Sequence, residues 1–307
     1  MMKPDISVII CTHNPRRDYL NRVLAALKSQ TLPQTQWELL LIDNASIQSL
    51  AAEIDLGWHP HARHIREEQL GLTPARLCGI HAAQAELLVF VDDDNVLAPD
   101  YLEVALNIGE AFASIGAWGG QTLPEFEETP PEWTKPYWGM LGIREFDRDK
   151  WSNIVNQHET TPCGAGMCVR KVVAQEYARR VKDEPRRFNL DRKGSLLTSC
   201  GDADLAFTAC DIGLGTGLFV ALKLTHLMPK QRLQEEYLLR LREAMSYSDA
   251  MLDSFRGNIR ELPGIVGQSR LIESYLLLRS HPQIRRFYLA SKRGHRKAFQ
   301  EVTSGSN

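Results

Sequence analysis

Short apolar runs alternate with amphipathic segments along the first half of the chain. Strands are predicted at Ile6 to Cys11, Trp37 to Ile42, Glu86 to Val91 and, more weakly, around Ile65. Between them, Tyr19 to Leu27 carries leucine and valine at helical spacing, and Thr73-Pro74 opens a helix that runs to about Gln84. Strands that alternate with helices in this way form parallel sheets covered on both faces.

The second half continues this alternation less regularly. Its predicted elements are a helix from Pro99-Asp100, a strand from Ile115 to Thr122, a helix ending near Lys182, a helix from Asp202 to Ile212 and a strand from Leu218 to Leu224. From Leu123 to about Thr161 the chain is rich in Pro, Trp and acidic residues without a period, which predicts a long lid loop. From Lys230 onward the composition is helical.

Together these patterns predict an α/β fold, in which a mostly parallel, Rossmann-like sheet is flanked by helices and followed by a helical C-terminal extension. We expect one domain over residues 1–229, built from halves 1–122 and 123–229, and a helical subdomain over residues 230–307.

Composition narrows the class of protein. A net charge of -2 gives no overall attraction to nucleic acid, so recognition of phosphate requires a local arrangement of residues. Six cysteines occur without a CxxC pair, which argues against a zinc site and fits a reduced, cytoplasmic setting. The sequence shows no apolar stretch suited to a signal peptide or a membrane span. We therefore expect a protein that is neither exported nor membrane-spanning.

Polar residues stand where three of the predicted strands end. They are the segments Thr12 to Arg17, Asp43 to Ser46 and Asp92 to Asn95. In an open parallel sheet, ligands bind beyond the carboxyl ends of the strands, where such loops meet. We expect these segments to face one edge of the sheet.

The aspartates Asp92, Asp93 and Asp94 follow a fully apolar strand. Three adjacent carboxylates are not buried unpaired, and magnesium or manganese prefers carboxylate and phosphate oxygens as ligands. A strand-end carboxylate of this kind can hold a divalent cation against a diphosphate leaving group. The structural alternative is a solvated acidic turn that precedes the next helix.

Several motifs together resemble those of glycosyltransferase family 2, over about residues 5 to 240. They are Ser7 to Arg16, Leu41 to Ser46, Gly71 to Arg76, Phe90 to Asn95, Gly164 to Met167, Gly201 to Leu205 and His226 to Pro229. The resemblance implies a GT-A fold and an inverting transfer of sugar from a nucleotide-sugar to a hydroxyl acceptor of a polysaccharide, glycolipid or similar glycoconjugate. It favours UDP as the nucleotide and Mn²⁺ or Mg²⁺ as the cofactor.

The resemblance also implies roles for single residues in residues 1–122, the nucleotide-sugar-binding half. Contacts with the donor nucleotide are implied for Thr12, Asn14, Arg16, Asp43, Arg76, Asp92 and Asp93. Asp43 would accept from the base, Asp93 would bond the ribose, and Asp94 would be the direct metal ligand of a DxD-type motif that Asp92 completes. The alternative for Asp92 is that it shapes the turn. For Arg16 and Arg76, an ordinary surface ion pair is the alternative.

In the acceptor-side half, residues 123–229, the resemblance implies that Asp202 is the general base that takes the proton of the acceptor hydroxyl. The family has Glu before this Asp, whereas this chain has Gly201, so Asp204 is a further candidate for part of the role. The structural alternative for Asp202 is a helix N-cap, which is compatible with the catalytic role.

Other features of this half have two interpretations each. His226 is either a second metal or diphosphate ligand or a structural hydrogen-bonding residue. The small residues Gly164, Ala165 and Gly166 suit close approach of the acceptor or form a plain turn. The cluster of Trp133, Tyr137 and Trp138 either stacks on sugars or pins the lid loop.

The segment from Arg279 to Lys297 holds seven Lys or Arg residues and no acidic residue, interleaved with apolar ones. Such a segment has three interpretations. It contacts an anionic membrane peripherally, where a lipid-linked acceptor is made; it forms a solvated helix face; or it forms a contact between protomers of an oligomer.

Two other functions remain open at this point: a sugar-nucleotide-forming nucleotidyltransferase and a non-catalytic nucleotide-sugar-binding relative. The strand-end loop from Cys11 to Arg17 lacks the glycines typical of the former.

Overall fold

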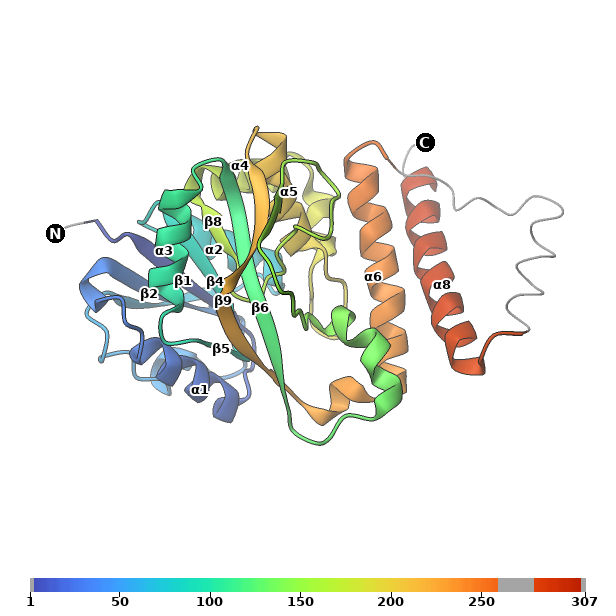
Figure 1. The fold of residues 1–307 in the computed structure, drawn as a ribbon, viewed down its shortest axis with the longest axis horizontal. Helices are drawn as coiled ribbons and strands as arrows, with labels where there is room; N and C mark the ends of the chain where they lie inside the picture. The colour runs from blue at the N-terminus through green and yellow to red at the C-terminus, as the bar shows by residue number, and fades with distance from the viewer. Residues whose placement is uncertain (1–2, 259–278, 305–307) are drawn as a thin grey trace. The chain divides into compact units, whose positions relative to one another are not determined.

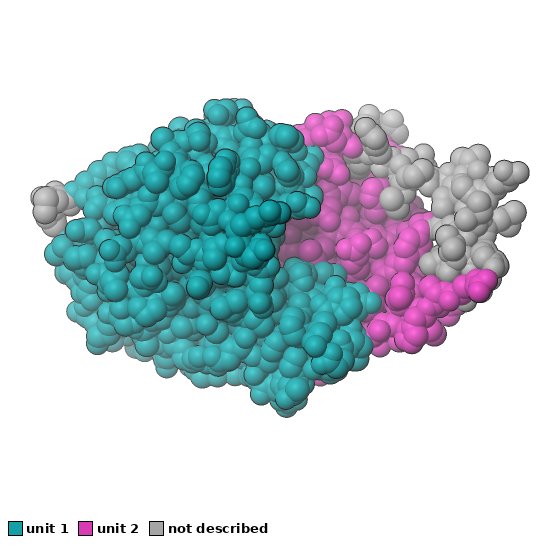
Figure 2. Space-filling model, viewed as in Figure 1, with its two compact units in different colours: residues 1–188, 201–230 teal, residues 189–200, 231–307 magenta. Residues whose placement is uncertain are grey.

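The computed structural model describes residues 3–258 and 279–304, and the chain divides into two compact units, which are coloured separately in Figure 2. Unit 1 comprises Met1–Phe188 and Gly201–Lys230, and unit 2 comprises Asn189–Cys200 and Gln231–Asn307. The predicted boundary after residue 229 lies next to this division. Residues 189–200, which we assigned to the first domain, belong to unit 2 instead, because they bond to a helix that is distant in sequence.

Unit 1 is built around one sheet, which has nine strands in the described part of the chain (Figure 1). The strands are β1 Ile6–Thr12, β2 Trp37–Asn44, β3 Ala62–Glu67, β4 Leu87–Asp92, β5 Asn95–Leu97, β6 Ile115–Phe126, β7 Lys150–Ser152, β8 Cys168–Arg170 and β9 Gly215–Met228. Their order is β3-β2-β1-β4-β8-β6-β9-β5, with β7 paired to β9.

Pairing is parallel from β3 through β4 and between β6 and β9, and it is antiparallel at β8, β5 and β7. The sheet is therefore mixed, and the predicted parallel character holds for the first half of unit 1. The parallel register places Thr12 opposite Asp43, and Asp43 opposite Arg66. Strand-end residues from distant parts of the sequence consequently share one edge of the sheet.

Helices cover both faces of this sheet. Their bounds are α1 Arg17–Lys28, α2 Leu72–Ala82, α3 Tyr101–Ala111, α4 Lys171–Asp183 and α5 Gly201–Asp211. The apolar side chains of α1 and α3 pack into one core with alternate residues of the strands, and those of α2, α4 and α5 pack into a second core on the opposite face. The α/β/α layering follows from this alternation, since both faces of the parallel strands are apolar.

Two predicted boundaries in the second half are wrong. The strand β6 continues four residues into the segment that we predicted as a lid loop, and β9 extends on both sides of the predicted Leu218 to Leu224. These strands pair with each other as far as Phe126 and Met228, so hydrogen bonding along the ladder extends them past the residues with a clear apolar pattern.

The rest of the lid segment contains a 3₁₀ helix, η3 Glu132–Leu141. Within it, the indole of Trp138 donates to Thr134 Oγ1 at 3.1 Å, and its ring lies 4.9 Å from that of Phe126. These contacts favour the interpretation that the aromatic residues pin the segment.

The described part of unit 2 contains α6 Glu235–Phe255 and α8 Pro282–Ser304, which pack along one another. Two arginines of the basic segment form ion pairs with α6, Arg286 with Glu235 at 2.7 Å and Arg293 with Glu243 at 2.8 Å. Part of the positive charge is therefore neutralised within the unit. Among the described residues, no helix combines the length and apolarity needed to cross a membrane.

Candidate functional site

An acidic cluster lies where β4 ends and the chain turns into β5. Asp94 is buried, and its Oδ2 lies 3.4 Å from Nε2 of His226, which is also buried. The two residues meet because β5 pairs with β9, so that Asn95 is opposite His226 and the amide of Leu227 donates to the Asp94 carbonyl at 2.8 Å. The structure thus brings together two residues that lie 132 positions apart in the sequence (226 − 94).

The electrostatics of Asp92 identify the other members of this cluster. Burial raises the pKa of Asp92 above its ordinary value, and the charges of Asp94 and Asp202 raise it further, whereas Arg76 and His226 act in the opposite direction. These five residues are called the acidic edge below. Like charges that disfavour one another's ionisation are typical of sites that bind a cation or hold a catalytic carboxylate.

Asp202 stands in the first turn of α5 and is partly exposed. Its Oδ2 accepts a hydrogen bond from the amide of Gly164 at 2.8 Å. A Cβ atom at position 164 would lie 2.5 Å from Nη2 of Arg76, so a larger residue there would require the guanidinium beside Asp202 to shift. This contact explains one of the small residues in the predicted acceptor-side motif.

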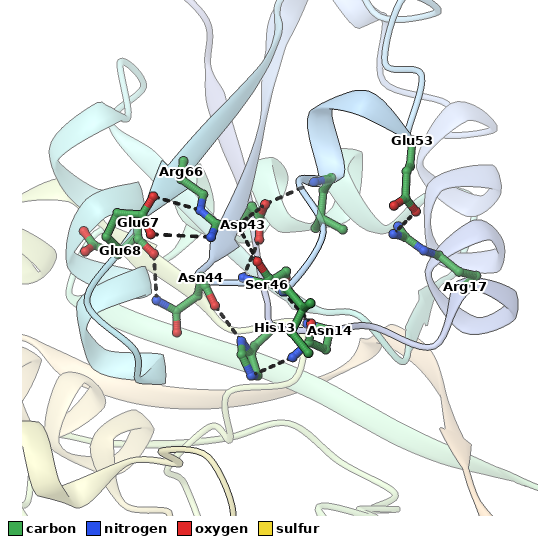
Figure 3. Close-up of polar contacts among 12 residues, drawn as sticks. His13, Asn14, Arg17, Asp43, Asn44, Ser46, Glu53, Arg66, Glu67 and Glu68 are labelled. Carbon is green, nitrogen blue, oxygen red and sulfur yellow. Dashed lines mark hydrogen bonds and ion pairs between the residues drawn. The ribbon is translucent and has the colours of Figure 1, made fainter.

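The strand-end loops of β1, β2 and β3 form a second group, called the nucleotide-edge loops below (Figure 3). Asp43 is buried and accepts hydrogen bonds from the amides of Ser46 and Leu50 at 3.1 Å each, and from Nη1 of Arg66 at 2.8 Å. Although burial opposes ionisation, the hydrogen bonds from Ser46, Leu50 and Arg66 lower the pKa of Asp43 below its ordinary value. Asp43 is therefore a fixed anion in the folded protein.

His13 and Asn14 complete the nucleotide-edge loops. The His13 Nδ1 lies 2.7 Å from the Asn44 carbonyl oxygen, and the amide of Asn14 donates to Ser46 Oγ at 2.9 Å. Figure 3 shows both side chains close to Asn44 and Ser46. Asn14 has a φ of 47°, a left-handed conformation that Asn tolerates better than most residues. The loop that leaves β1 is thus tied to the loop that leaves β2.

Thr12 links the two groups. It ends β1, and its hydroxyl donates a short hydrogen bond to Oδ2 of Asp93, which follows β4. Because β1 is the neighbour of both β2 and β4, this bond connects the nucleotide-edge loops to the aspartates.

Three of the predicted site residues bond to residues outside the acidic edge and the nucleotide-edge loops. Arg16 is exposed, forms ion pairs with Asp18 and Glu127, and lies over the ring of Tyr19, as the surface alternative predicts. Asp204 is fully buried and accepts from Nη1 of Arg187 at 2.5 and 2.6 Å. The Gly166 carbonyl accepts from the Tyr101 hydroxyl at 2.6 Å in the core.

Ala165, between the two glycines, is buried and belongs to the core on the α1 and α3 face. Of the three small residues in this motif, Gly164 is therefore the one that the structure connects to Asp202.

Sequence reasoning did not name Arg66 and Arg187. Arg66 lies one residue before the end of β3, opposite Asp43, so the rule that strand ends carry the site would have found it if the third strand had been assigned to its end. No local pattern marks Arg187, since its partner is known only from the folded chain.

The acidic edge is suited to a divalent cation that a bound diphosphate also coordinates. Asp94 and His226 offer one carboxylate and one imidazole side by side, which are acceptable donors for manganese or magnesium in a site completed by phosphate oxygens and water. Within residues 3–258 and 279–304, no three His, Cys, Asp or Glu side chains are grouped so as to hold a metal by themselves. A cation here would therefore depend on oxygens from a bound diphosphate.

Comparison with known proteins gives consistent results. The family described as "Glycosyl transferase family 2" matches residues 7–178, which is more than half of the chain. Polypeptide N-acetylgalactosaminyltransferase 8 of Drosophila melanogaster is 35% identical over 104 residues, which is 33% of this chain and 18% of that protein. Glycosyltransferase AglE of Haloferax volcanii is 32% identical over 94 residues, covering 30% of this chain and 31% of AglE. The alignments thus span less than a third of either relative.

Among solved structures, S. aureus TarS 1-349 in complex with UDP-GlcNAc superposes with a TM-score of 0.54 at 15% identity, over 94% of this chain and 79% of that one. The same protein in complex with UDP gives a TM-score of 0.53 at 15% identity, over 99% and 92% of the two chains. The likeness confirms the predicted GT-A fold.

Proposed function

Because the chain belongs to glycosyl transferase family 2, we propose that it transfers a sugar from a UDP-sugar to a hydroxyl group of a polysaccharide, glycolipid or similar glycoconjugate acceptor, with inversion at the sugar carbon. The observation that carries the proposal is the acidic edge, where Arg76, two strand-end aspartates, His226 and the helix-borne Asp202 converge.

The donor nucleotide is assigned to the nucleotide-edge loops. Asp43 is ionised, buried and held from three directions, which suits it to a fixed acceptor for a base. Asn14 and Thr12 border it, and Asp93, which accepts from Thr12, is assigned to the ribose. UDP is preferred as the nucleotide because the TarS structures of the same fold contain UDP and UDP-GlcNAc.

The diphosphate is assigned to the acidic edge. Asp94 and His226 are the residues that would hold a divalent cation, with Asp92 adjacent. Such a cation neutralises the charge that develops on the diphosphate as it leaves. Arg76, buried at the same edge, adds positive charge on the side of Gly164.

Asp202 is assigned as the general base. In a single displacement, the acceptor oxygen forms a bond to the sugar carbon, the bond from that carbon to the diphosphate oxygen breaks, and the hydroxyl proton passes to Asp202. The Gly164 amide fixes Oδ2 of Asp202 and so orients the carboxylate. Gly201, in place of the family Glu, removes one carboxylate from this turn, and Asp204 is engaged with Arg187. The proton-accepting role therefore falls on Asp202 alone.

Peripheral contact with an anionic membrane is a further proposal for the segment Arg279 to Lys297. Helix α8 exposes Ile284 (57%) and Leu289 (42%) among its basic residues, a combination that binds lipid surfaces. Sedimentation with vesicles, with and without phosphatidylserine, tests this proposal. Equal binding to both kinds of vesicle would contradict it.

Calorimetric titration of UDP, with and without Mn²⁺, tests the main proposal. We expect binding that depends on Mn²⁺ and is weakened about 100-fold or more by Asp94→Ala. Asp100→Ala is the matched control, because Asp100 is an exposed aspartate outside the acidic edge that makes no capping bond. Absence of nucleotide binding by the parent protein would overturn the proposal and favour another activity. Binding without transfer would favour the non-catalytic alternative.

A further inference from the structure

The proposed general base is held by a short turn within unit 1. Residues 164–167 form this turn, called the glycine turn below, in which the amide of Met167 donates to the Gly164 carbonyl at 3.4 Å. The amide of Gly164 itself donates to Oδ2 of Asp202 at 2.8 Å. The orientation of the Asp202 carboxylate therefore depends on where the glycine turn lies.

The hydroxyl of Tyr101 fixes the middle of the glycine turn. It donates to the Gly166 carbonyl at 2.6 Å, and the Tyr101 side chain is fully buried. Gly166 has a φ of 69°, and a Cβ atom at this position would overlap the Tyr101 oxygen, so the turn packs directly on the hydroxyl. The thiol of Cys168 also donates to this carbonyl, but at 3.6 Å and as a weak donor. The strong hydrogen bond to the turn is thus the one from Tyr101.

Tyr101 stands on the chain segment that carries Asp94. This segment continues from Asp94 through β5 to the start of α3, where the amide of Tyr101 donates to the Ala98 carbonyl at 3.0 Å. The ring of Tyr101 belongs to the same apolar core as Ala165 of the glycine turn. The hydroxyl therefore joins the segment that carries Asp94 to the turn that holds Asp202, and every residue of this connection lies in unit 1.

The plain structural explanation for Tyr101 is a buried hydroxyl that satisfies a carbonyl group. The position of that carbonyl goes beyond this explanation, because it lies two residues from the amide that holds Asp202. Burial also raises the pKa of Tyr101 well above its ordinary value, so the hydroxyl keeps its proton and remains a donor at neutral pH.

We propose that Tyr101 is a positioning residue for Asp202: its hydroxyl holds the glycine turn, and the Gly164 amide of that turn orients the carboxylate towards the acceptor oxygen. This inference rests on the proposed function of Asp202. Misplacing a reacting group by about 1 Å can reduce turnover by about 100-fold, so loss of a bond that fixes the turn acts on kcat. Nucleotide affinity is unaffected, because the hydroxyl bonds to the glycine turn and not to the nucleotide-edge loops.

The closest test compares Tyr101→Phe with Tyr247→Phe, each of which removes one hydroxyl group. Tyr247 donates to Glu301 at 2.7 Å, and both of these residues belong to unit 2. The probe reaction is hydrolysis of UDP-GlcNAc in Mn²⁺, in which water replaces the acceptor hydroxyl. We expect Tyr101→Phe to lower kcat about tenfold with an unchanged Kd for UDP, and Tyr247→Phe to retain the parent values. Equal kcat values in the two variants would overturn the proposal.

A double variant, Tyr101→Phe with Asp202→Asn, separates positioning of the base from general damage to the fold. If Tyr101 acts through Asp202, its substitution should not lower the residual kcat any further once the carboxylate has been removed. Long incubations of both Asp202→Asn proteins with UDP-GlcNAc measure this residual rate. A further tenfold loss in the double variant would show that Tyr101 acts elsewhere and would overturn the positioning role.

A second pair of variants changes the same contact from the turn and applies even if Tyr101→Phe does not fold. Gly166→Ala would place a methyl group against the Tyr101 hydroxyl and Leu224. Gly213→Ala is the matched control, because Gly213 also has a positive φ, of 85°, but a Cβ atom there meets nothing within 4 Å. We expect Gly166→Ala to lower kcat about tenfold or more at unchanged UDP affinity, and Gly213→Ala to retain the parent kcat. The same kcat in both glycine variants would contradict the proposal.

Hydrogen exchange separates failure of this inference from failure of the proposed function. The amide of Gly164 should exchange about tenfold faster in Tyr101→Phe than in Tyr247→Phe, whether or not sugar is transferred. Equal exchange would overturn the positioning role. A parent protein that binds UDP but transfers no sugar to water or to any other acceptor would overturn the proposed function, while exchange at Gly164 would still decide whether Tyr101 holds the turn.

Discussion

The nucleotide-edge loops and the acidic edge lie on the same rim of the sheet but treat their charges in opposite ways. At the loops, Asp43 receives two amide hydrogen bonds and one from Arg66, and its pKa is lowered despite burial. At the acidic edge, burial and the charges of Asp94 and Asp202 raise the pKa of Asp92.

This difference separates a group whose carboxylate charge is already compensated by hydrogen bonds within the protein from a group whose carboxylate charges are not. Folding satisfies Asp43, so the ionised carboxylate stabilises the protein and fixes the shape of the loops. Folding brings the carboxylates of the acidic edge together at a cost in stability, which a cation and a diphosphate would relieve on binding. The first group is suited to recognition, and the second is suited to a reaction in which negative charge moves.

The largest expected effect is that of Asp202→Asn on turnover. The amide keeps the size of the carboxylate but cannot take up the acceptor proton, so kcat should fall about 1,000-fold with little change in UDP affinity. Steady-state kinetics and calorimetry of the same preparation measure the two quantities. Asp211→Asn, at the other end of α5, is the matched control. A variant at position 202 that transfers sugar at the parent rate would rule out its role as base.

A buried histidine in the N-terminal part of unit 1 gives a large effect of pH on stability. His59 packs on Trp37 with ring centroids 4.1 Å apart, and burial, assisted by the charge of His61, lowers the pKa of His59 from 6.5 to about 4. Between these values the unfolded chain binds a proton that the folded chain does not. The free energy of unfolding should therefore fall as the pH falls from 6.5 towards 4, by about 3 kcal/mol from this residue.

Urea unfolding at pH 7 and at pH 4.5 measures this effect. His59→Phe should show a weaker dependence on pH than the parent protein, whereas the exposed His81→Gln should follow the parent. Parallel curves for His59→Phe and the parent would contradict the assignment.

The contrast between the nucleotide-edge loops and the acidic edge is tested by two substitutions, Asp43→Asn and Asp92→Asn. Asp43→Asn weakens the bond to Arg66 and should destabilise the metal-free protein by about 2 kcal/mol at pH 7. Its deficit should shrink as the pH falls below 3.8, because the unfolded chain then binds a proton that the lowered pKa of Asp43 keeps off the folded protein. Asp92→Asn removes a disfavoured charge and should stabilise the metal-free protein by about 1 kcal/mol at pH 7, with a gain that vanishes at acid pH. Thermal unfolding across pH measures both, and shifts of the same sign would refute the contrast.

The smallest expected effect is that of Arg16→Ala. Its ion pairs with Asp18 and Glu127 are exposed, and exposed pairs contribute little because water and salt screen them. We expect UDP affinity within about twofold of the parent, as measured by calorimetry. A tenfold loss of affinity would instead place Arg16 at the donor nucleotide.

The strand-end motifs were predictable because their signal is local. Apolar runs that stop abruptly at Thr12, Asp43 and Asp92 indicate buried parallel strands, and parallel strands end at one edge whatever their distance in sequence. The same logic supplied the strand-end residues of both groups, whereas the family resemblance supplied Arg76, Asp202 and His226. It did not supply Arg66, because the β3 strand has a weak apolar pattern and its end could not be located.

The sequence by itself determined the α/β class, the order of the strands that carry the motifs and the membership of the family, because periodicity and short motifs depend on neighbouring residues. Only the tertiary structure decided that His226 lies against Asp94, that Arg187 forms an ion pair with Asp204, and that residues 189–200 belong to unit 2. Each of these pairings depends on chain segments that are distant in sequence, and it is the packing of the whole fold that brings their side chains within bonding distance.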